Sequence, residues 1–450
     1  MPYPFIGRHR ELSVLSELHD SQRPELFVLY GRRRVGKTEL LQRFCDRRRA
    51  IYFLAAQVRE KDNLNAFASA VREALPGALP EGVAFDDWSA ALRFCAERAG
   101  DERLVVVLDE FPYLCESNKG LPSVLQGFWD TVGKRSNLML VLCGSQVSFM
   151  EQEVLAEHSP LFGRRTAQRR LEPLPPSESL RFFEGWELEQ RLLAYAILGG
   201  MPAYLQRFDL HQDLRSNLMR EVLRPEGYLF DEVQFLLRSD LTQPATYNSI
   251  LRAVAGGAER VGDVALTVGV ESTTANRYLS VLREIGLVER FVPLTDPDPL
   301  RSRKGSYRIA DRFLAFHARH VQPHLSLIEA GRGERVFERS IEPDLPRLQR
   351  EALGDLAIEH LRREAGALFD REVLEVGRHN GEAIRALGRL EDGELVAALV
   401  NLPGGPDPEA IEAELVDLRR QSGTVVHRLR YGLGRSPEAP LKVERPKAAP

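Results

Sequence analysis

The sequence lacks the features that would mark it as a membrane protein or as a protein drawn to nucleic acid by overall charge. Over 450 residues the formal net charge is −4 at pH 7, so a nucleic-acid surface would have to be a local patch. No apolar run approaches the length of a membrane span. The first residues lack a charged segment followed by an apolar one, which argues against a signal peptide. We therefore expect a cytoplasmic protein with no membrane partner.

Cysteine is also scarce. The four cysteines are Cys45, Cys95, Cys115 and Cys143, and no two of them have C-x-x-C spacing. Each lies in or beside a segment with the pattern of a buried helix or strand. We expect structural thiols in a reducing compartment, and neither a zinc site nor a disulfide framework.

The most informative segment that is present spans residues 31–38, which read GRRRVGKT and fit the pattern G-x-x-x-x-G-K-[ST]. The apolar residues 26–30 before it predict a buried strand, and residues 39–49 after it predict a helix, which is the context that the motif requires. In such a loop, glycines let amide groups point at phosphate oxygens, and the following helix adds its positive dipole end. We predict that Lys37 reaches the outer phosphates and that Thr38 ligates Mg²⁺. The loop residues predicted to bind the nucleotide are Gly31, Arg32, Arg33, Arg34, Val35, Gly36, Lys37, Thr38 and Glu39.

A second signal is the unbroken apolar run at residues 104–108, which ends in Asp109-Glu110. Such a run is typical of a central parallel strand, and open α/β sheets place their ligands at the carboxyl ends of these strands. We predict that Asp109 holds Mg²⁺, directly or through water. Glu110 is then placed to orient and polarise the attacking water.

The next apolar run, residues 138–143, is followed by Gly144, Ser145 and Gln146. A polar side chain at this strand end would touch the γ-phosphate or the water. Capping of the following helix is an equally common use of a serine. Ser145 is therefore a catalytic candidate with a structural alternative.

Strands and helices alternate through the first 175 residues, which predicts an α/β fold in which helices cover both faces of a parallel sheet. The length suggests about three domains. We assign residues 1–175 to a P-loop NTPase core. Residues 176–241 keep helical spacing throughout and are expected to form a helical lid.

Residues 242–325 predict a winged helix and a bridge, with helices at 245–255, 261–267 and 273–285 and a strand at 286–292. The third helix would present side chains able to contact DNA, namely Thr273, Thr274, Asn276, Arg277 and Arg283. This face is thinly basic, and Glu271 and Glu284 flank it. An internal regulatory joint is therefore the alternative to a DNA reader.

In their order and spacing, these motifs resemble the prokaryotic P-loop ATPases related to AAA+ and STAND proteins, often called archaeal-type ATPases. The segments FIGR at 5–8, PLFGR at 160–164 and GGMPAYL at 199–205 add to the resemblance, which extends to about residue 316. It implies that Phe5, Ile6, Gly7 and Arg8 lie against the adenine and that Pro202 belongs to the lid turn that feels the nucleotide. It also implies that Arg164 senses or stabilises the γ-phosphate, with a surface or salt-bridged arginine as the alternative.

Many members of this family end in a restriction-endonuclease-like domain, and residues 326–435 have the element order of a small α/β domain of that type. An active nuclease needs an acid on the second strand and E-x-K on the third. Those strands read AIRALGRL and LVAALVNL, and an arginine stands where a metal-binding carboxylate would be expected. We expect no nuclease activity. The tail at 436–450 has too little apolar content to fold.

The sequence therefore predicts an ATP-binding, Mg²⁺-dependent ATPase that acts as a molecular switch, coupling its nucleotide state to movement of the lid and winged helix. The alternative is a DNA-binding regulator in which nucleotide only sets the conformation. No N-K-x-D base-reading motif is evident, and the family resemblance favours ATP over GTP. The expected partners are ATP and ADP, with DNA, another protein or a second copy of the chain as candidates.

Overall fold

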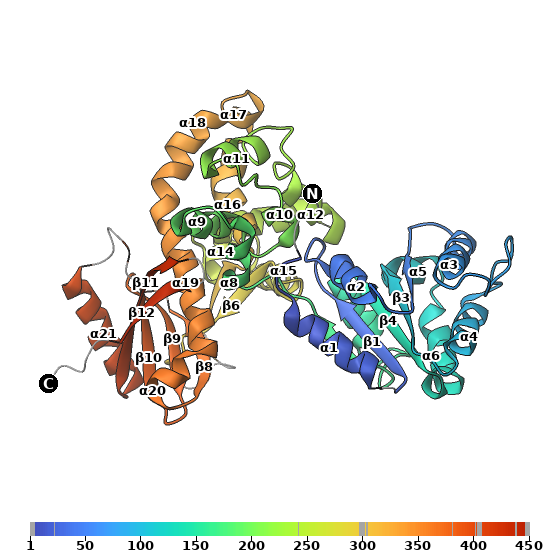
Figure 1. Cartoon of the computed structure of the whole chain (residues 1–450). Coiled ribbons are helices and arrows are strands. Elements are labelled where there is room, and N and C mark those ends of the chain that lie inside the picture. Colours follow the sequence, from blue (N-terminus) through green and yellow to red (C-terminus); the bar gives the residue numbers. More distant parts are fainter. Residues whose placement is uncertain are drawn as a thin grey trace. The chain divides into compact units, whose positions relative to one another are not determined.

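The structure is a computed structural model that describes residues 5–21, 23–241, 243–296, 302, 305–379, 381–400, 402, 407–436 and 439–445. The chain divides into two compact units (Figure 1). Residues 7–173 form the N-terminal unit. The C-terminal unit comprises residues 174–450 together with the chain start up to Ile6.

The N-terminal unit is built on a five-stranded sheet with strand order β2-β3-β4-β1-β5, in which every neighbouring pair is parallel. The strands are β1 (Glu25–Tyr30), β2 (Ala50–Leu54), β3 (Leu104–Asp109), β4 (Leu138–Gly144) and β5 (Ala167–Arg170). All residues of β1, β3 and β4 are buried, which explains why these strands read as unbroken apolar runs. The predicted α/β fold with a parallel P-loop NTPase sheet is confirmed.

Helices connect these strands. They are α1 (His9–Asp20), α2 (Lys37–Cys45), α3 (Glu60–Ala74), α4 (Trp88–Ala99), α5 (Phe111–Ser117), α6 (Leu121–Thr131) and α7 (Val147–Phe149), with a 3₁₀ turn at Gly133–Arg135 and a π-helical turn at Met150–Leu155. The helix after the glycine-rich loop was expected to reach residue 49, and this is wrong. It ends at Cys45 because the following backbone leaves the helical region, with a φ of 63° at Arg47.

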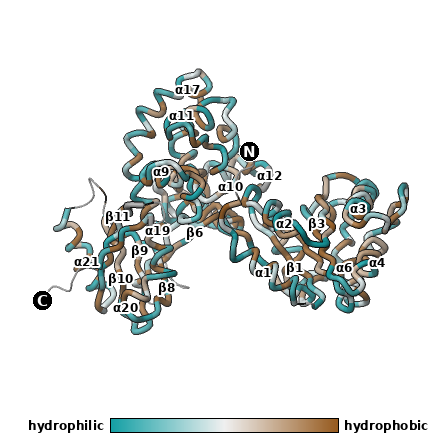
Figure 2. Tube along the Cα trace, viewed as in Figure 1, coloured by the Kyte–Doolittle hydropathy of each residue, from teal (hydrophilic) through white to brown (hydrophobic). Residues whose placement is uncertain are grey.

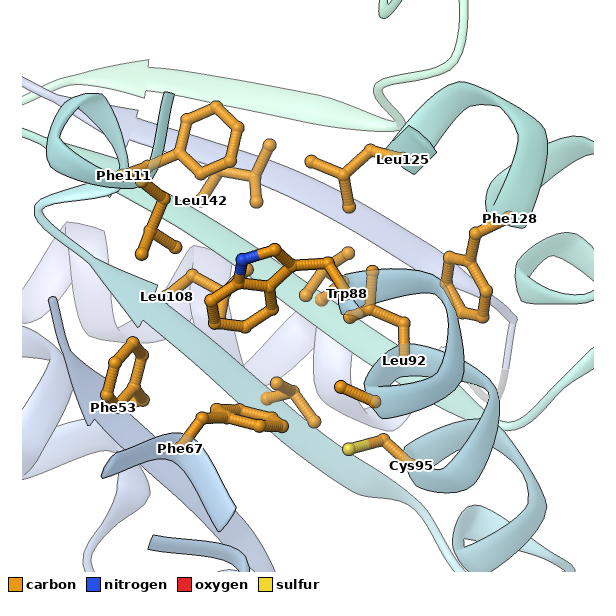
Figure 3. Packing of buried hydrophobic residues seen from close by; sticks show 14 of the residues in the cluster. Phe53, Phe67, Trp88, Leu92, Cys95, Leu108, Phe111, Leu125, Phe128 and Leu142 are labelled. Atoms are coloured by element: carbon orange, nitrogen blue, oxygen red, sulfur yellow. The ribbon is translucent and has the colours of Figure 1, made fainter. Parts of the chain in front are cut away.

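An aromatic cluster anchors β2 against the helices on one face of the sheet (Figure 3). The ring of Trp88 on α4 lies 5.4 Å from that of Phe67 on α3 and 6.0 Å from that of Phe53 on β2. Trp88 is 1% exposed. Because side chains alternate along a strand, burial of Phe53 in this cluster turns its neighbour Tyr52 towards the other face.

In the C-terminal unit, residues 176–241 are helical, as expected. The helices are α8 (Pro176–Ser179), α9 (Leu188–Leu198), α10 (Pro202–Leu205), α11 (Leu214–Glu221) and α12 (Glu232–Asp240), with a 3₁₀ turn at Leu180–Phe183. They are followed by α13 (Pro244–Ala255), α14 (Val261–Val268), α15 (Ser272–Glu284) and an antiparallel pair of strands, β6 (Val288–Phe291) and β7 (Ser306–Ile309). We call α13–α15 with β6 and β7 the three-helix module. Its assignment as a winged helix, and the domain boundaries within this unit, stay predictions.

A series of helical segments, most of them short, leads to the last sheet. It consists of α16 (Arg312–Phe316), α17 (Leu325–Glu329), α18 (Gly333–Val336) and the long α19 (Leu345–Arg363), then α20 (Ala365–Phe369), with π or 3₁₀ turns at His317–Val321, Gln322–His324, Phe337–Ile341 and Glu342–Asp344. The sheet has order β12-β11-β10-β9-β8, and only β10 and β11 are parallel. Its elements are β8 (Val373–Arg378), β9 (Ile384–Leu390), β10 (Leu395–Val400), α21 (Pro408–Ser422), β11 (Val426–Ser436) and β12 (Ala439–Glu444).

Strand β12 corrects one expectation. The tail from residue 436 was predicted to be unfolded, yet Ala439–Glu444 pair with β11. Leu441 and Val443 alternate along β12 and pack on the core of this sheet, so two apolar side chains and an available strand edge are enough to order a polar segment. Residues 437, 438 and 446–450 of the predicted tail lie outside the described residues.

Figure 2 shows the hydrophobic residues following the central strands of both sheets, while the helices alternate between hydrophobic and hydrophilic. Among the residues that the structure describes, no helix combines the length and the apolar character that a membrane crossing requires. The four cysteines are free thiols of the N-terminal unit. Cys95, Cys115 and Cys143 are buried, and Cys45 is partly exposed.

Candidate active site

The glycine-rich loop connects β1 to α2, which begins at Lys37. Its conformation depends on two glycines. Gly36 has a φ of 95°, in the region that side chains disfavour, and a Cβ on Gly31 would lie 2.4 Å from the backbone oxygen of Leu171. The glycines of the motif are therefore required by the backbone path, and that path curls the loop around its own amide groups.

Lys37 lies inside this curl. Its Nζ donates to the backbone oxygens of Gly31 at 2.9 Å and Arg32 at 3.0 Å, and the residue is 6% exposed. An ammonium group has three donors, so one remains for an oxygen that enters the loop. The position suits a cation that faces the phosphates of a bound nucleotide.

Thr38 and Asp109 meet at the carboxyl edge of the sheet. Thr38 Oγ1 donates to Asp109 Oδ2 at 2.9 Å, and the amide of Glu110 donates to Asp109 Oδ1, also at 2.9 Å. Asp109 is fully buried, whereas Thr38 is exposed to solvent. A carboxylate and a hydroxyl in contact are the hard oxygen ligands that Mg²⁺ prefers, so these residues fit that metal.

Tyr52 joins this pair, although the sequence did not indicate it. Its hydroxyl donates to Asp109 Oδ2 at 2.5 Å. Burial, and then the negative charge of Asp109, raise the pKa of Tyr52 far above its usual value, so the hydroxyl stays protonated and remains a donor. The residue comes from β2, which pairs with β3, and the two strands β3 and β4 separate β2 from β1, the strand that leads into the glycine-rich loop. The one sequence feature that could have pointed to Tyr52 is its hydroxyl group in an otherwise apolar strand.

Glu110 sits immediately after β3 with a left-handed backbone, at a φ of 54°. Its Oε2 accepts from the hydroxyl of Ser145 at 2.8 Å and from the amide of Ser145 at 3.2 Å. Ser145 therefore contacts the carboxylate and does not cap the helix that follows, whose first turn has no side-chain cap. Strain at a non-glycine residue is common at functional positions, because the surrounding structure must hold it there.

Arg8 binds the backbone of the glycine-rich loop through its guanidinium group. Its Nη2 donates to the backbone oxygens of Val35 at 2.9 Å and Glu172 at 2.8 Å, and the residue is 6% exposed. The guanidinium thus links the glycine-rich loop to the segment after β5. The expected adenine contact of Phe5, Ile6, Gly7 and Arg8 stays a prediction, as does the role of Pro202, which begins α10 in the C-terminal unit.

The other loop residues differ in their surroundings. Arg33 Nη2 donates to the hydroxyl of Tyr113 at 2.9 Å, and Arg34 adopts a left-handed φ of 69°. Arg32 and Val35 are buried, while Glu39 is exposed in the first turn of α2. Their contacts with a nucleotide stay predictions.

Arg164 lies far from this site within the N-terminal unit. The amide of Thr166 donates to the backbone oxygen of Leu26 at 2.9 Å, so Arg164 precedes the start of β5 beside the beginning of β1. From Leu26 to Gly31 the strand rises by roughly 16 Å. Arg164 instead pairs with Asp130, with Nη2 2.9 Å from Oδ2. The pair with Asp130 is the salt-bridged alternative, and a γ-phosphate role for Arg164 stays a prediction.

The chain is similar to known proteins in both sequence and fold. Residues 5–208 match a family described as an ATPase domain predominantly from Archaea. An uncharacterized protein of Methanocaldococcus jannaschii is 33% identical over 327 residues, which cover 73% of this chain and 71% of that protein. The chain belongs to this family of archaeal-type ATPases. A second protein of that organism, an uncharacterized ATP-binding protein, is 40% identical over 45 residues, covering 10% of this chain and 76% of its own.

Among solved structures, the Walker-type ATPase of Pyrococcus abyssi is similar to this ATPase with a TM-score of 0.53 and 20% sequence identity. The similarity covers 70% of this chain and 96% of that one. At this identity the likeness shows a shared fold. It agrees with the parallel sheet and the glycine-rich loop that place Lys37, Thr38 and Asp109 together.

Proposed function

We propose that this ATPase binds ATP with Mg²⁺ and hydrolyses it as a molecular switch. The observation that carries the proposal is the contact of Thr38 with Asp109 beside the Lys37 ammonium, with Glu110 next in the chain. The cation, the two oxygens at the proposed metal site and the adjacent acid are the groups that phosphoryl transfer to water requires. The family match supports the same reading.

Each group has a separate task in this proposal. The loop amides and Lys37 hold the phosphates, and Lys37 exchanges its contacts with the loop carbonyls for phosphate oxygens. Thr38 and Asp109 hold Mg²⁺, which when bound neutralises the charge that develops on the outer phosphates. Glu110 leaves the Ser145 hydroxyl, orients the attacking water and accepts its proton.

The switch requires a path from the nucleotide to the rest of the chain. In the C-terminal unit, the hydroxyl of Tyr195 on α9 donates to Asp355 on α19 at 3.1 Å, and Arg312 on α16 binds the same carboxylate. These contacts support a proposal in which the lid helices move together with the elements behind them. A shift of α9 between nucleotide states would then reach the three-helix module through α16.

A direct test is to measure phosphate release by the purified full chain with ATP and with GTP, each with Mg²⁺ and with the metal chelated. The proposal expects Mg²⁺-dependent turnover of ATP and weaker turnover of GTP. Absence of turnover, together with normal binding of ATP, would leave the chain a nucleotide-binding protein and contradict the hydrolytic part of the proposal.

Replacing Tyr52 with phenylalanine tests the hydroxyl that contacts Asp109. We expect about a tenfold loss of apparent Mg²⁺ affinity, because outer hydrogen-bond partners fix the orientation of a metal-binding carboxylate. The measurement is the Mg²⁺ dependence of ATP turnover. Tyr113→Phe is the matched control, since that hydroxyl contacts Arg33 and not Asp109. Equal Mg²⁺ dependence in both variants would rule out the positioning role.

The second candidate function is DNA binding by the three-helix module. It is favoured by the exposure of Thr273, Asn276, Arg277 and Arg283 along α15. Replacing Arg277 and Arg283 with glutamine would then weaken duplex binding and lower its salt slope by about two, one for each lost phosphate contact. Arg252→Gln, an exposed arginine on α13, is the control. Unchanged affinity in the double variant would make the module an internal joint.

A second copy of the chain is a further proposed partner. Arg164 is partly exposed beside Asp130, away from the nucleotide site of its own unit. We propose that Arg164 contacts the γ-phosphate of a nucleotide bound by a neighbouring copy, where it would have its predicted role.

A further inference from the structure

A cavity of about 500 Å³ is lined entirely by residues of the C-terminal unit. Its walls come from α9, α13, β7, α16 and the turn after it, α19 and β9. The volume is in the range of sites that hold small organic ligands. Nothing in the proposed ATPase mechanism uses this cavity.

The lining is strongly cationic. Five arginines contribute to it, namely Arg308, Arg312, Arg319, Arg347 and Arg385. The carboxylates that share the lining are those of Glu259 and Glu351. The charge of the lining side chains therefore favours an anion.

Most acidic partners of these arginines are not among the lining residues. Arg308 pairs with Glu289, Arg312 pairs with Asp355, and Arg347 Nη2 lies 2.5 Å from Asp344 Oδ2. Arg312 and Arg347 also pair with Glu351, which lines the cavity. Arg308 binds Glu289 through Nε, so its terminal N–H groups remain donors for an oxygen anion, because a guanidinium carries five N–H groups.

The positive charge of Arg385 is the one least compensated by nearby carboxylates. It is half-buried on β9, and its Nη1 donates to the backbone oxygen of Gly381 at 3.1 Å. Within the described residues, no carboxylate lies within 4.0 Å of its guanidinium nitrogens. Burial lowers its pKa, Glu351 opposes this, and Arg378 and Arg312 lower it further. A cation withdrawn from water among like charges is costly until an anion joins it.

Apolar side chains complete the walls. Ile309, Phe316 and Leu348 line the cavity together with the arginines. Guanidinium groups beside an apolar wall suit a ligand that has both an anionic group and a less polar part.

We propose that this cavity binds a phosphorylated small molecule, with the phosphate held by Arg385, Arg319 and Arg308. Guanidinium groups match phosphate oxygens in geometry and charge. Since the walls come from lid, three-helix module and C-terminal sheet, the ligand would hold these parts in one arrangement and so set how they respond to nucleotide.

The test is calorimetric titration of the full chain with inorganic pyrophosphate at about 0.15 M salt. The background is the Lys37→Ala variant, which removes the principal cation of the nucleotide-binding loop. We expect binding to persist in that background. Adding Arg385→Gln should weaken it at least about tenfold, the size of one charge-assisted contact. Arg389→Gln is the matched control, because it lies on the same strand and pairs with Glu375 outside the cavity.

Heat unfolding of each variant checks that the fold is intact, and Arg319→Gln, at an exposed arginine of the lining, gives a second measurement if Arg385→Gln unfolds. The proposal is wrong if Lys37→Ala binds no pyrophosphate, or if the arginine variants bind it as well as Arg389→Gln does. It is also wrong if a short DNA duplex binds through Arg385 while pyrophosphate does not. Because the readout is binding without hydrolysis, these outcomes are independent of the ATPase proposal.

Discussion

Replacing Glu110 with glutamine is expected to stop ATP turnover while nucleotide binding persists. The carboxamide has nearly the same shape and still accepts a hydrogen bond from Ser145, but it no longer serves as a base for the attacking water. Loss of a general base costs roughly 10²–10⁴-fold, so we expect turnover to fall at least about 100-fold. Single-turnover phosphate release measures the rate, and calorimetric titration with ATP measures the binding.

Glu116→Gln is the matched control for this experiment. Glu116 lies on α5, six residues further along, and it contacts Gln57 and Gln146 at the surface. Its replacement should leave turnover unchanged. A Glu110→Gln variant that hydrolyses ATP at the wild-type rate would show that another group prepares the water.

Replacing Lys37 with alanine is expected to abolish tight binding of ATP. The ammonium lies inside the loop, where it holds two backbone oxygens, and its loss leaves the phosphate charges without their nearest cation. Two charge-assisted contacts correspond to a loss of roughly 100-fold or more in affinity. Titration with ATP in the presence of Mg²⁺ measures it.

Lys61→Ala is the control for this second change, because Lys61 is exposed on α3. Heat unfolding separates a binding defect from a folding defect, since the alanine variant also leaves two loop carbonyls without their donor. Unaltered ATP affinity of a folded Lys37→Ala variant would mean that the loop does not hold the phosphates.

The nucleotide-binding half of the fold could be predicted because its signals are local. Runs of consecutive apolar residues identify buried parallel strands, and the glycine positions of the loop follow from the φ of Gly36 and the close approach of Leu171 to Gly31. The contact between Thr38 and Asp109 follows in turn, since Thr38 begins the helix after β1 and Asp109 ends β3, and the carboxyl ends of parallel strands meet at one edge of the sheet.

The misses concern features that depend on which elements are neighbours in space. Tyr52 was overlooked because nothing in its own strand shows that β2 pairs with β3 and brings its hydroxyl to Asp109. The pairing of Arg164 with Asp130 could not be read from its motif either, because the register of β5 against β1 decides at which end of the strands Arg164 lies. Strand β12 was not predicted because the segment is ordered by pairing with the edge of β11, which its own composition does not indicate.

The distribution of thiols has a practical consequence. All four cysteines belong to residues 7–173, and burial raises the pKa of Cys45 and of Cys95 to about 12 and that of Cys143 well above its usual value. Thiolate is the species that reacts with alkylating reagents, so the buried Cys95, Cys115 and Cys143 are shielded while their half of the chain stays folded, whereas Cys45 is partly exposed. Chemical labelling of the three buried thiols thus reports transient opening of that half alone, without a signal from the remainder and without an engineered probe.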